Sequence, residues 1–312
     1  MMVAFSLVQL KLKHSRWILR SHGLQPRFIE LHNGCKIQCW APPAASSKPA
    51  LLFLHGFGAS GTIAWDSQVA PFSKHFSLYL PDLLFFGAST IDTGVDSQHQ
   101  HAVEQSSTSK VEHPERTVKF SEIFQAECMH EAMNKMGVQE AVVLGHSYGG
   151  FVAYHMAHLY PSFVKRVVIV SSGIMMDSHT NDSLLQEFGS SRIHDMLVPP
   201  TLPLFKESLQ LTFNGYLPPW LPSFFYKDMF ELVDDIILGK EDSSPLPTID
   251  QSLLILWGDE DRIFNINLAY KLKEFLGAKA ELCTIKVASH VPQVVNPREI
   301  NKLLLSFLNV SV

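Results

Sequence analysis

The sequence predicts a mostly parallel, doubly wound α/β sheet with a helical cap inserted into it. Short runs rich in β-branched and other apolar residues alternate with stretches of helical periodicity. These runs are almost continuously apolar, which is typical of strands in a parallel sheet that is covered on both faces. One long segment, residues 174–250, interrupts the alternation late in the chain and is predicted to be the cap.

The predicted strands begin with a hairpin. Segments 28–31 and 36–40 flank the dipeptide Asn33-Gly34, which is typical of tight hairpin turns. Buried strands are then predicted for the apolar runs at 50–56, 77–82, 141–147, 166–172, 252–258 and 281–287. Because helical stretches separate these runs, we expect βαβ units and parallel strand pairs.

Three predicted helices frame the sheet. In residues 120–136, apolar side chains recur every three or four positions, and Gly137 is a typical helix stop. A second helix begins after Ser147 and ends at Pro161. The last covers residues 297–309 and starts with a proline, which suits the first turn of a helix.

These elements divide the chain into four parts. They are an N-terminal amphipathic helix at 1–27, a first core part at 28–173, a helical cap at 174–250 and a second core part at 251–312. Within the first core part, residues 91–116 are polar and rich in Ser, Gln and His, as in a surface loop. Its histidines are not held in space by a core, so no metal site is predicted there.

The N-terminal segment carries five Lys or Arg residues and no acid before Glu30. A basic amphipathic helix is predicted from apolar residues at helical spacing, namely Val3, Leu7, Leu10, Trp17 and Ile18. Such a helix can touch a membrane surface, act as an organellar presequence or pack on the domain, and packing is the commonest role of an apolar stripe. No apolar run reaches the ~18 residues that a membrane span needs.

Composition excludes some functions. The 312 residues include 25 Lys or Arg and 30 Asp or Glu, so the net charge of −5 gives no reason to expect a nucleic-acid partner. The four cysteines form no CxxC pair, and Cys35 and Cys39 would lie roughly 13 Å apart on one extended strand. We therefore expect a reduced, cytoplasmic protein without structural zinc, with membrane association or an organelle as the alternatives. The sequence does not indicate an oligomeric state.

Residues 145–150 read GHSYGG, so Gly145, Ser147 and Gly149 form a G-x-S-x-G motif. The motif lies between a predicted strand and a predicted helix, which is the context of a nucleophile elbow. A Cβ at either glycine would collide with the neighbouring strand and helix. The serine hydroxyl would then stand at the carboxyl edge of the sheet, above a helix N-terminus that favours negative charge. Ser147 is therefore predicted to be a catalytic nucleophile.

A serine nucleophile needs a base, and an acid must orient that base. After such an elbow, the acid and then the base follow later strands. His290 follows the last predicted strand and is predicted to be the base. Three adjacent acids, Asp259, Glu260 and Asp261, follow the strand before it. Turn position favours Asp261 as the orienting acid, with Asp259 as the alternative.

Two backbone N–H groups should form an oxyanion hole. One is expected from Tyr148, the residue after the nucleophile, and the other from Phe57 in the HGFG segment after the first buried strand. Gly56 and Gly58 would let this segment approach a substrate closely. His55 is expected to form structural hydrogen bonds rather than to act as a second base.

Together these motifs resemble the α/β-hydrolase superfamily. HGFG, PDLLFFGAS, GHSYGG, WGDEDRIF and the Ser-His after the last strand occur in the superfamily's order and cover nearly the whole chain. PDLLFFG, FQAECMHEAM, SYGGFVAYHMA and LILWGDEDRIF are more closely similar to plant hydrolases near the monoacylglycerol lipases and epoxide hydrolases. In the superfamily the acid is the fourth residue of G-x-x-D after the seventh core strand, which implies Asp261.

The resemblance implies a helical cap over an acyl pocket, no metal or other cofactor, and hydrolysis of an ester or thioester. It argues against an epoxide hydrolase, because those relatives carry Asp where this chain has Ser147. Candidates for the apolar acyl pocket are Met175, Met176, Trp220, Phe224, Phe225 and Phe264.

The predicted function is therefore a serine hydrolase, an esterase or a monoacylglycerol-lipase-like enzyme acting on a small-molecule ester. Two alternatives stay open: a hormone-type ligand receptor on a hydrolase scaffold, and a carbon–carbon hydrolase or lyase with the same triad.

Overall fold

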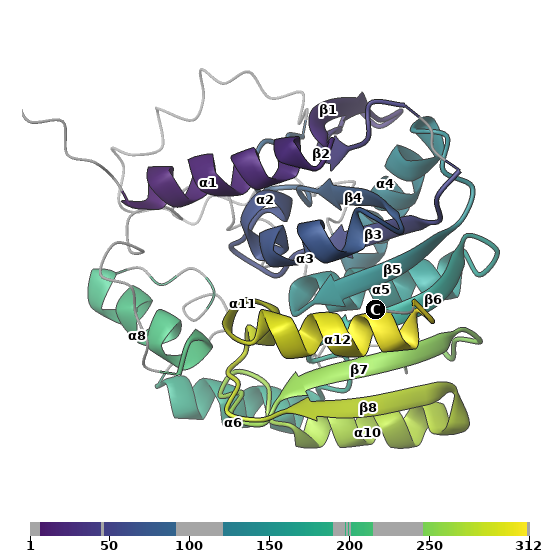
Figure 1. The fold of residues 1–312 in the computed structure, drawn as a ribbon. Coiled ribbons are helices and arrows are strands. Elements are labelled where there is room, and N and C mark those ends of the chain that lie inside the picture. Colours follow the sequence, from purple (N-terminus) through teal and green to yellow (C-terminus); the bar gives the residue numbers. More distant parts are fainter. Residues whose placement is uncertain are drawn as a thin grey trace, which may run out of the picture.

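The computed structural model describes residues 7–44, 47–91, 121–189, 197, 199, 201–214 and 246–310. These residues contain one sheet with the strand order β1-β2-β4-β3-β5-β6-β7-β8 (Figure 1). The strands are β1 (Gln25–Glu30), β2 (Lys36–Ala41), β3 (Ala50–Leu54), β4 (Ser77–Pro81), β5 (Ala141–His146), β6 (Val164–Val170), β7 (Ser252–Gly258) and β8 (Ala280–Ile285). β2 is antiparallel to β1 and β4, and the pairs from β4 to β8 are parallel. The predicted mostly parallel α/β sheet is confirmed.

Helices cover both faces of this sheet. They are α1 (Leu7–Ser21), α2 (Gly61–Ala64), α3 (Asp66–Phe72), α4 (Glu122–Lys135), α5 (Tyr148–Leu159), α6 (Ser178–Phe188), α8 (Leu202–Thr212), α10 (Asn267–Leu276), α11 (Pro292–Val295) and α12 (Pro297–Phe307), with a 3₁₀ turn at Gly277–Lys279. In Figure 1, α1, α2, α3 and α12 lie in front of the strands, and α4, α5 and α10 lie behind them.

The two faces explain why the central strands are almost continuously apolar. In β3, Leu51 and Phe53 belong to the core beneath α1, α3 and α12, whereas Leu52 and Leu54 belong to the core beneath α4 and α5. All four side chains are at most 1% exposed. Since successive residues of a strand point to opposite faces, a strand covered on both sides has no position left for a polar residue.

The prediction for the last strand is wrong in part. β8 ends at Ile285, two residues earlier than expected, as β3 and β6 also do, and Val287 is 74% exposed with a positive φ of 52°. In β8 only Ala280 and Ile285 are buried, and the residues between them are exposed or half-buried, because the strand forms the edge of the sheet and has only β7 as a neighbour. The apolar run 281–287 does not distinguish an edge strand from a central one.

The face of α1 that packs on the domain differs from the predicted apolar stripe. Leu10 is 50% exposed and Trp17 64% exposed, although both belong to that stripe, whereas Ile18 of the same stripe packs against the core. The inward face includes the buried Ser15 and Leu19. Ser15 donates its hydroxyl hydrogen bond to the buried Asp66 at the start of α3, so a polar contact sets the orientation of the helix.

Two predicted segments fall largely outside the described residues. Of the polar loop at 91–116, only residue 91 is described. Of the predicted cap at 174–250, the structure describes α6, α8 and short flanking stretches. Both the loop and the cap therefore stay predictions. No described helix is long and apolar enough to cross a membrane.

Candidate active site

Ser147 lies in a strained turn between β5 and α5. Its φ of 51° and ψ of −118° are rarely adopted by residues with a side chain. An added Cβ would lie 2.1 Å from the Gly149 carbonyl oxygen if built on Gly145, and 2.5 Å from the Leu54 carbonyl oxygen if built on Gly149. The Ser147 N–H donates to the Val170 carbonyl at 2.9 Å. Because all these contacts involve the main chain, the turn has little freedom to relax.

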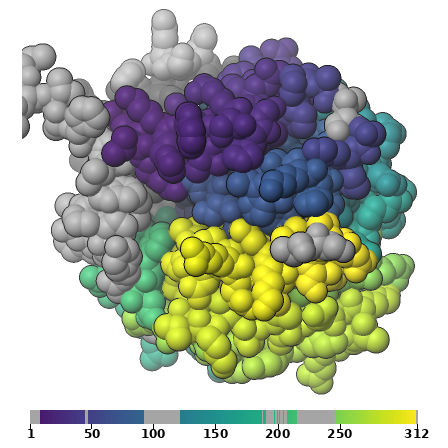
Figure 2. Space-filling view, viewed as in Figure 1, coloured from purple at the N-terminus to yellow at the C-terminus, as the bar shows by residue number. Residues whose placement is uncertain are grey.

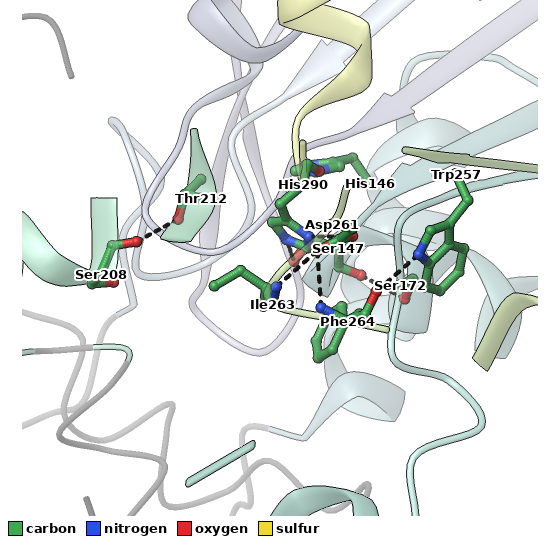
Figure 3. Close-up of polar contacts among 10 residues, drawn as sticks. All are labelled: His146, Ser147, Ser172, Ser208, Thr212, Trp257, Asp261, Ile263, Phe264 and His290. Atoms are coloured by element: carbon green, nitrogen blue, oxygen red, sulfur yellow. Dashed lines mark hydrogen bonds and ion pairs between the residues drawn. The ribbon is translucent and has the colours of Figure 1, made fainter. Parts of the chain in front are cut away.

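The side chains of Ser147, His290 and Asp261 form a continuous line of hydrogen bonds (Figure 3). Ser147 Oγ lies 2.9 Å from His290 Nε2, and His290 Nδ1 lies 2.9 Å from Asp261 Oδ2. Asp261 Oδ1 accepts the N–H groups of Ile263 and Phe264, each at 2.9 Å. With Nδ1–H donating to the buried carboxylate, Nε2 can accept the serine proton, as a general base must.

Of the three adjacent acids, Asp261 is the one that bonds to the histidine. Asp259 lies beside Lys286, whose Nζ is 3.5 Å from Asp259 Oδ2. Glu260 is exposed and accepts a hydrogen bond from Asn214, just after α8. The turn thus directs its three carboxylates to three different environments, and the geometry favours Asp261 over Asp259 as the orienting acid.

The segment after β3 lies against the nucleophile. An added Cβ on Gly56 would lie 3.1 Å from Ser147 Cβ, so glycine allows a close approach. His55 Nδ1–H donates to the Gly56 carbonyl at 2.8 Å, and His55 Nε2 accepts the Leu83 N–H at 2.9 Å. Burial lowers the pKa of His55 to about 4, so the ring is neutral near pH 7. His55 therefore forms structural hydrogen bonds, as its position in the sequence suggests.

The two residues predicted to supply oxyanion donors are in contact with each other. Phe57 follows β3, and Tyr148 is the first residue of α5. Their rings pack edge to face with centroids 6.4 Å apart. The positive end of a helix dipole lies at the N-terminus of α5, next to Ser147. This arrangement suits a developing negative charge, and the oxyanion role of the two amides stays a prediction.

A buried carboxylate that was not predicted supports the same edge. Asp82 Oδ1 accepts the Gly61 N–H, and Asp82 Oδ2 accepts the Ala88 N–H, both at 2.9 Å. Burial raises the pKa of Asp82 to about 6, although both hydrogen bonds oppose this shift. The signal in the sequence was an acid directly after a strand, within PDLLFFG. Asp82 thus ties the start of α2 to the loop after β4.

His146, the residue before the nucleophile, is a second unpredicted part of the site. Its Nε2–H donates to the main-chain carbonyl of His290 at 2.8 Å (Figure 3). The two rings lie 5.1 Å apart, and burial together with His290 lowers the pKa of His146 to about 3. His146 is therefore a neutral donor that holds the histidine loop against the elbow. The feature of the sequence that could have indicated this role is the histidine inside the G-x-S-x-G motif.

The predicted pocket residues have different positions. The Phe264 ring is buried and lies 5.3 Å from the His290 ring. An added Cβ on Gly173 would lie 2.8 Å from the Phe264 ring, so the chain leading to Met175 and Met176 passes close to Phe264. Both methionines are half-buried. The remaining candidates lie outside the described residues, namely Trp220, Phe224 and Phe225.

In the part of the chain that the structure describes, no group of three or more His, Cys, Asp or Glu side chains is arranged to hold a metal ion. The histidines of the 91–116 loop lie outside this part.

Comparisons with known proteins agree with the fold. Residues 49–191 match a family model described as "alpha/beta hydrolase fold". An uncharacterized protein of Mycobacterium tuberculosis is 28% identical over 129 residues, which are 41% of this chain and 30% of that protein. A pimeloyl-[acyl-carrier protein] methyl ester esterase of Vibrio vulnificus is 23% identical over 284 residues, 83% of this chain and 94% of the esterase.

A solved structure extends the similarity over almost the entire chain. A bacterial membrane phospholipase A superposes with a TM-score of 0.72 at 22% identity, covering 98% of this chain and 92% of its own. At this identity the similarity concerns the fold.

Proposed function

Since the chain has the α/β-hydrolase fold, we propose that it is a serine hydrolase that cleaves carboxylic esters with an apolar acyl group. The observation that supports this most is the hydrogen-bonded line from Ser147 through His290 to Asp261, at 2.9 Å for each bond. The similarity to the Vibrio methyl ester esterase agrees with an ester substrate.

In the proposed mechanism, Ser147 Oγ attacks the acyl carbonyl carbon while His290 Nε2 takes the hydroxyl proton. Asp261 holds the imidazole with Nδ1–H toward the carboxylate and stabilises its positive form. The tetrahedral intermediate then expels the alcohol, which receives the proton from His290 Nε2. Water, deprotonated by the same nitrogen, hydrolyses the acyl-enzyme and regenerates Ser147.

The negative charge on the substrate oxygen needs donors that are already in position. We assign this role to the main-chain N–H groups of Phe57 and Tyr148. Two observations support it: the close approach of Gly56 to Ser147, and the position of Tyr148 at the N-terminus of α5. Removing one such donor typically lowers the rate by ~10²–10³.

An apolar acyl pocket beneath a cap of residues 174–250 belongs to the same proposal. Phe264 beside the base and the half-buried Met175 and Met176 support it. The proposal extends to Trp220, Phe224 and Phe225, and to a closer relation with the plant hydrolases near the monoacylglycerol lipases. The latter rests on sequence motifs such as PDLLFFG and LILWGDEDRIF.

The proposal is tested with p-nitrophenyl esters of increasing acyl length. We expect the wild-type protein to hydrolyse them and Ser147→Ala to lose at least about 10⁴-fold in kcat/KM. Ser21→Ala is the control, because its exposed hydroxyl makes only local hydrogen bonds among the described residues, to the Ile18 carbonyl and to His22. If the wild-type protein cleaves no ester but does cleave a β-diketone or a cyanohydrin, the proposed scissile bond is wrong, while the proposed role of the three residues stands. Tight ligand binding without turnover would instead favour a receptor.

A further inference from the structure

One side of α1 is fixed to the domain. Ser15 Oγ and Lys11 Nζ both contact Asp66 Oδ2 at 2.5 Å, and Asp66 is only 5% exposed. Leu19 is fully buried one turn after Ser15, and the Arg20 guanidinium lies 5.5 Å from the Trp40 ring centroid. The rotation of α1 about its axis is therefore set, and with it the side chains that face outward.

The outward side of α1 combines apolar and basic residues. Leu10, Lys13 and Trp17 follow one another at helical spacing and are all exposed. Arg16 and Arg20 are exposed as well. Among the described residues, Lys11 on the inward side forms an ion pair with the buried Asp66, and the charge of Arg16 acts on the buried Asp82. No acid occurs in the sequence before Glu30, although the chain as a whole carries −5. Basic charge is thus concentrated around an exposed tryptophan.

The position of α1 relates this surface to the candidate active site. α1 packs on α2 and α3. α2 starts at Gly61, shortly after the loop that approaches Ser147. In Figure 1, α1 begins at the end of the molecule toward which β5, β7 and β8 point, and Figure 2 shows it lying on the surface. A partner bound along α1 would therefore have one end, at the first turn of the helix, on the side of the molecule where the parallel strands end.

We propose that the outward face of α1 docks the protein on an anionic lipid bilayer, with the first turn of the helix toward the end of the molecule where the parallel strands finish. Tryptophan is favoured at the bilayer interface, where its ring is among headgroups and acyl chains. Cations around it gain attraction from anionic lipids. Because α1 is already folded and fixed, docking requires no ordering of the helix. This inference goes beyond the proposed ester hydrolysis, and the docking itself does not depend on it.

The test uses the full-length protein and sedimentation with vesicles. We expect binding to phosphatidylcholine vesicles that contain about 30% phosphatidylserine, and at least about tenfold weaker binding to vesicles of phosphatidylcholine alone. Lys13→Gln with Arg16→Gln should weaken binding to the anionic vesicles about tenfold or more, and salt should do the same by screening. Leu10→Ser with Trp17→Ser should weaken it on both kinds of vesicle.

The matched control lies on α10, on the other face of the sheet. Tyr270 and Phe275 are 53% and 40% exposed there, near Lys271 and Lys273. Tyr270→Ser with Phe275→Ser should bind vesicles like the wild type. Absence of wild-type binding at low salt overturns the proposal. Equal loss in the α10 variant also overturns it, since binding would then follow general surface hydrophobicity.

A second readout separates docking from catalysis. If the hydrolase proposal holds, the Leu10/Trp17 variant should hydrolyse a soluble p-nitrophenyl ester at the wild-type rate and a vesicle-embedded ester about tenfold more slowly. Vesicle binding by a protein without esterase activity would leave docking standing and overturn the hydrolase proposal. Unchanged hydrolysis of the embedded ester, together with unchanged vesicle binding, would overturn docking.

Discussion

The nucleophile elbow and helix α1 are both positioned by short polar or steric contacts. They differ in how many conformations or orientations would be possible without those contacts. At the elbow, main-chain atoms surround Gly145 and Gly149 so closely that only one backbone conformation fits, and this conformation fixes the position of Ser147. At α1, a helix of the same sequence could lie on the domain in several rotations, and the contact of Ser15 with Asp66 selects one. Motif spacing is therefore informative at the elbow, and apolar periodicity is much less so at α1.

The largest effect on catalysis is expected from substitutions in the turn after β7, which carries the three adjacent acids. Asp261→Asn should lower kcat by about 10⁴-fold, because an amide in place of the carboxylate no longer holds the imidazole in the required tautomer. Asp259→Asn is the matched control and should stay within about threefold, since Asp259 lies beside Lys286. Steady-state hydrolysis of a p-nitrophenyl ester measures both. If Asp259→Asn lowers kcat more than Asp261→Asn does, Asp259 is the orienting acid.

Gly145→Ala tests whether the elbow tolerates one methyl group. We expect it to lower the free energy of unfolding by at least about 3 kcal/mol or to prevent folding, because the new Cβ meets a main-chain carbonyl. Gly23→Ala is the comparison. Gly23 also has a positive φ, 78°, but nothing lies within 4 Å of its added Cβ, so about 1 kcal/mol is expected. Urea denaturation gives both values, and equal losses would contradict the steric explanation.

His146 provides a smaller effect on catalysis. His146→Leu removes the hydrogen bond to the His290 carbonyl and should lower kcat by about tenfold to a hundredfold through loss of alignment. His146→Gln can still donate from its side-chain amide and should recover activity to within about threefold of the wild type. If Gln and Leu behave alike while both variants melt like the wild type, the hydrogen bond does not position the base.

The pH dependence of stability should differ between the wild type and His146→Gln. The pKa of His146 in the folded protein is about 3, below the usual 6.5. Its contribution to the free energy of unfolding is therefore fully present above pH 6.5 and is lost as the pH falls toward 3. At pH 5 this loss is about 2 kcal/mol relative to pH 7. His55 acts in the same direction, whereas Asp82, with its pKa raised to about 6, acts in the opposite one. Urea denaturation at both pH values should show a smaller acid-induced loss in the Gln variant.

The sequence predicted the sheet well because central parallel strands have no solvent-facing side, so their apolar runs are continuous. Strand ends were less well predicted: β3, β6 and β8 each end two residues earlier than expected, and after β8 this leaves Val287 exposed. The sequence also predicted a line of three side chains that the structure brings within hydrogen-bond distance, because turn sterics and strand order restrict where they can lie.

The supporting residues were harder to predict. His146 and Asp82 act through bonds to main-chain groups that are distant in the sequence, from β5 to the loop after β8 and from the end of β4 to the start of α2. Such partners depend on the packed fold rather than on local spacing. For α1 the missing information was the buried Asp66, whose need for donors outweighed the apolar residues Leu10 and Trp17 in choosing the inward face.

The central claim is that Ser147 is an activated nucleophile. Identifying the residue that a fluorophosphonate probe labels is its most direct test. The probe phosphonylates a serine only when a base activates it and the surrounding site accepts a tetrahedral adduct. We predict one adduct, mapped by peptide mass spectrometry to Ser147, and its loss in Ser147→Ala and in His290→Ala. A folded wild-type protein that takes no label, or takes it on another serine, would contradict the account.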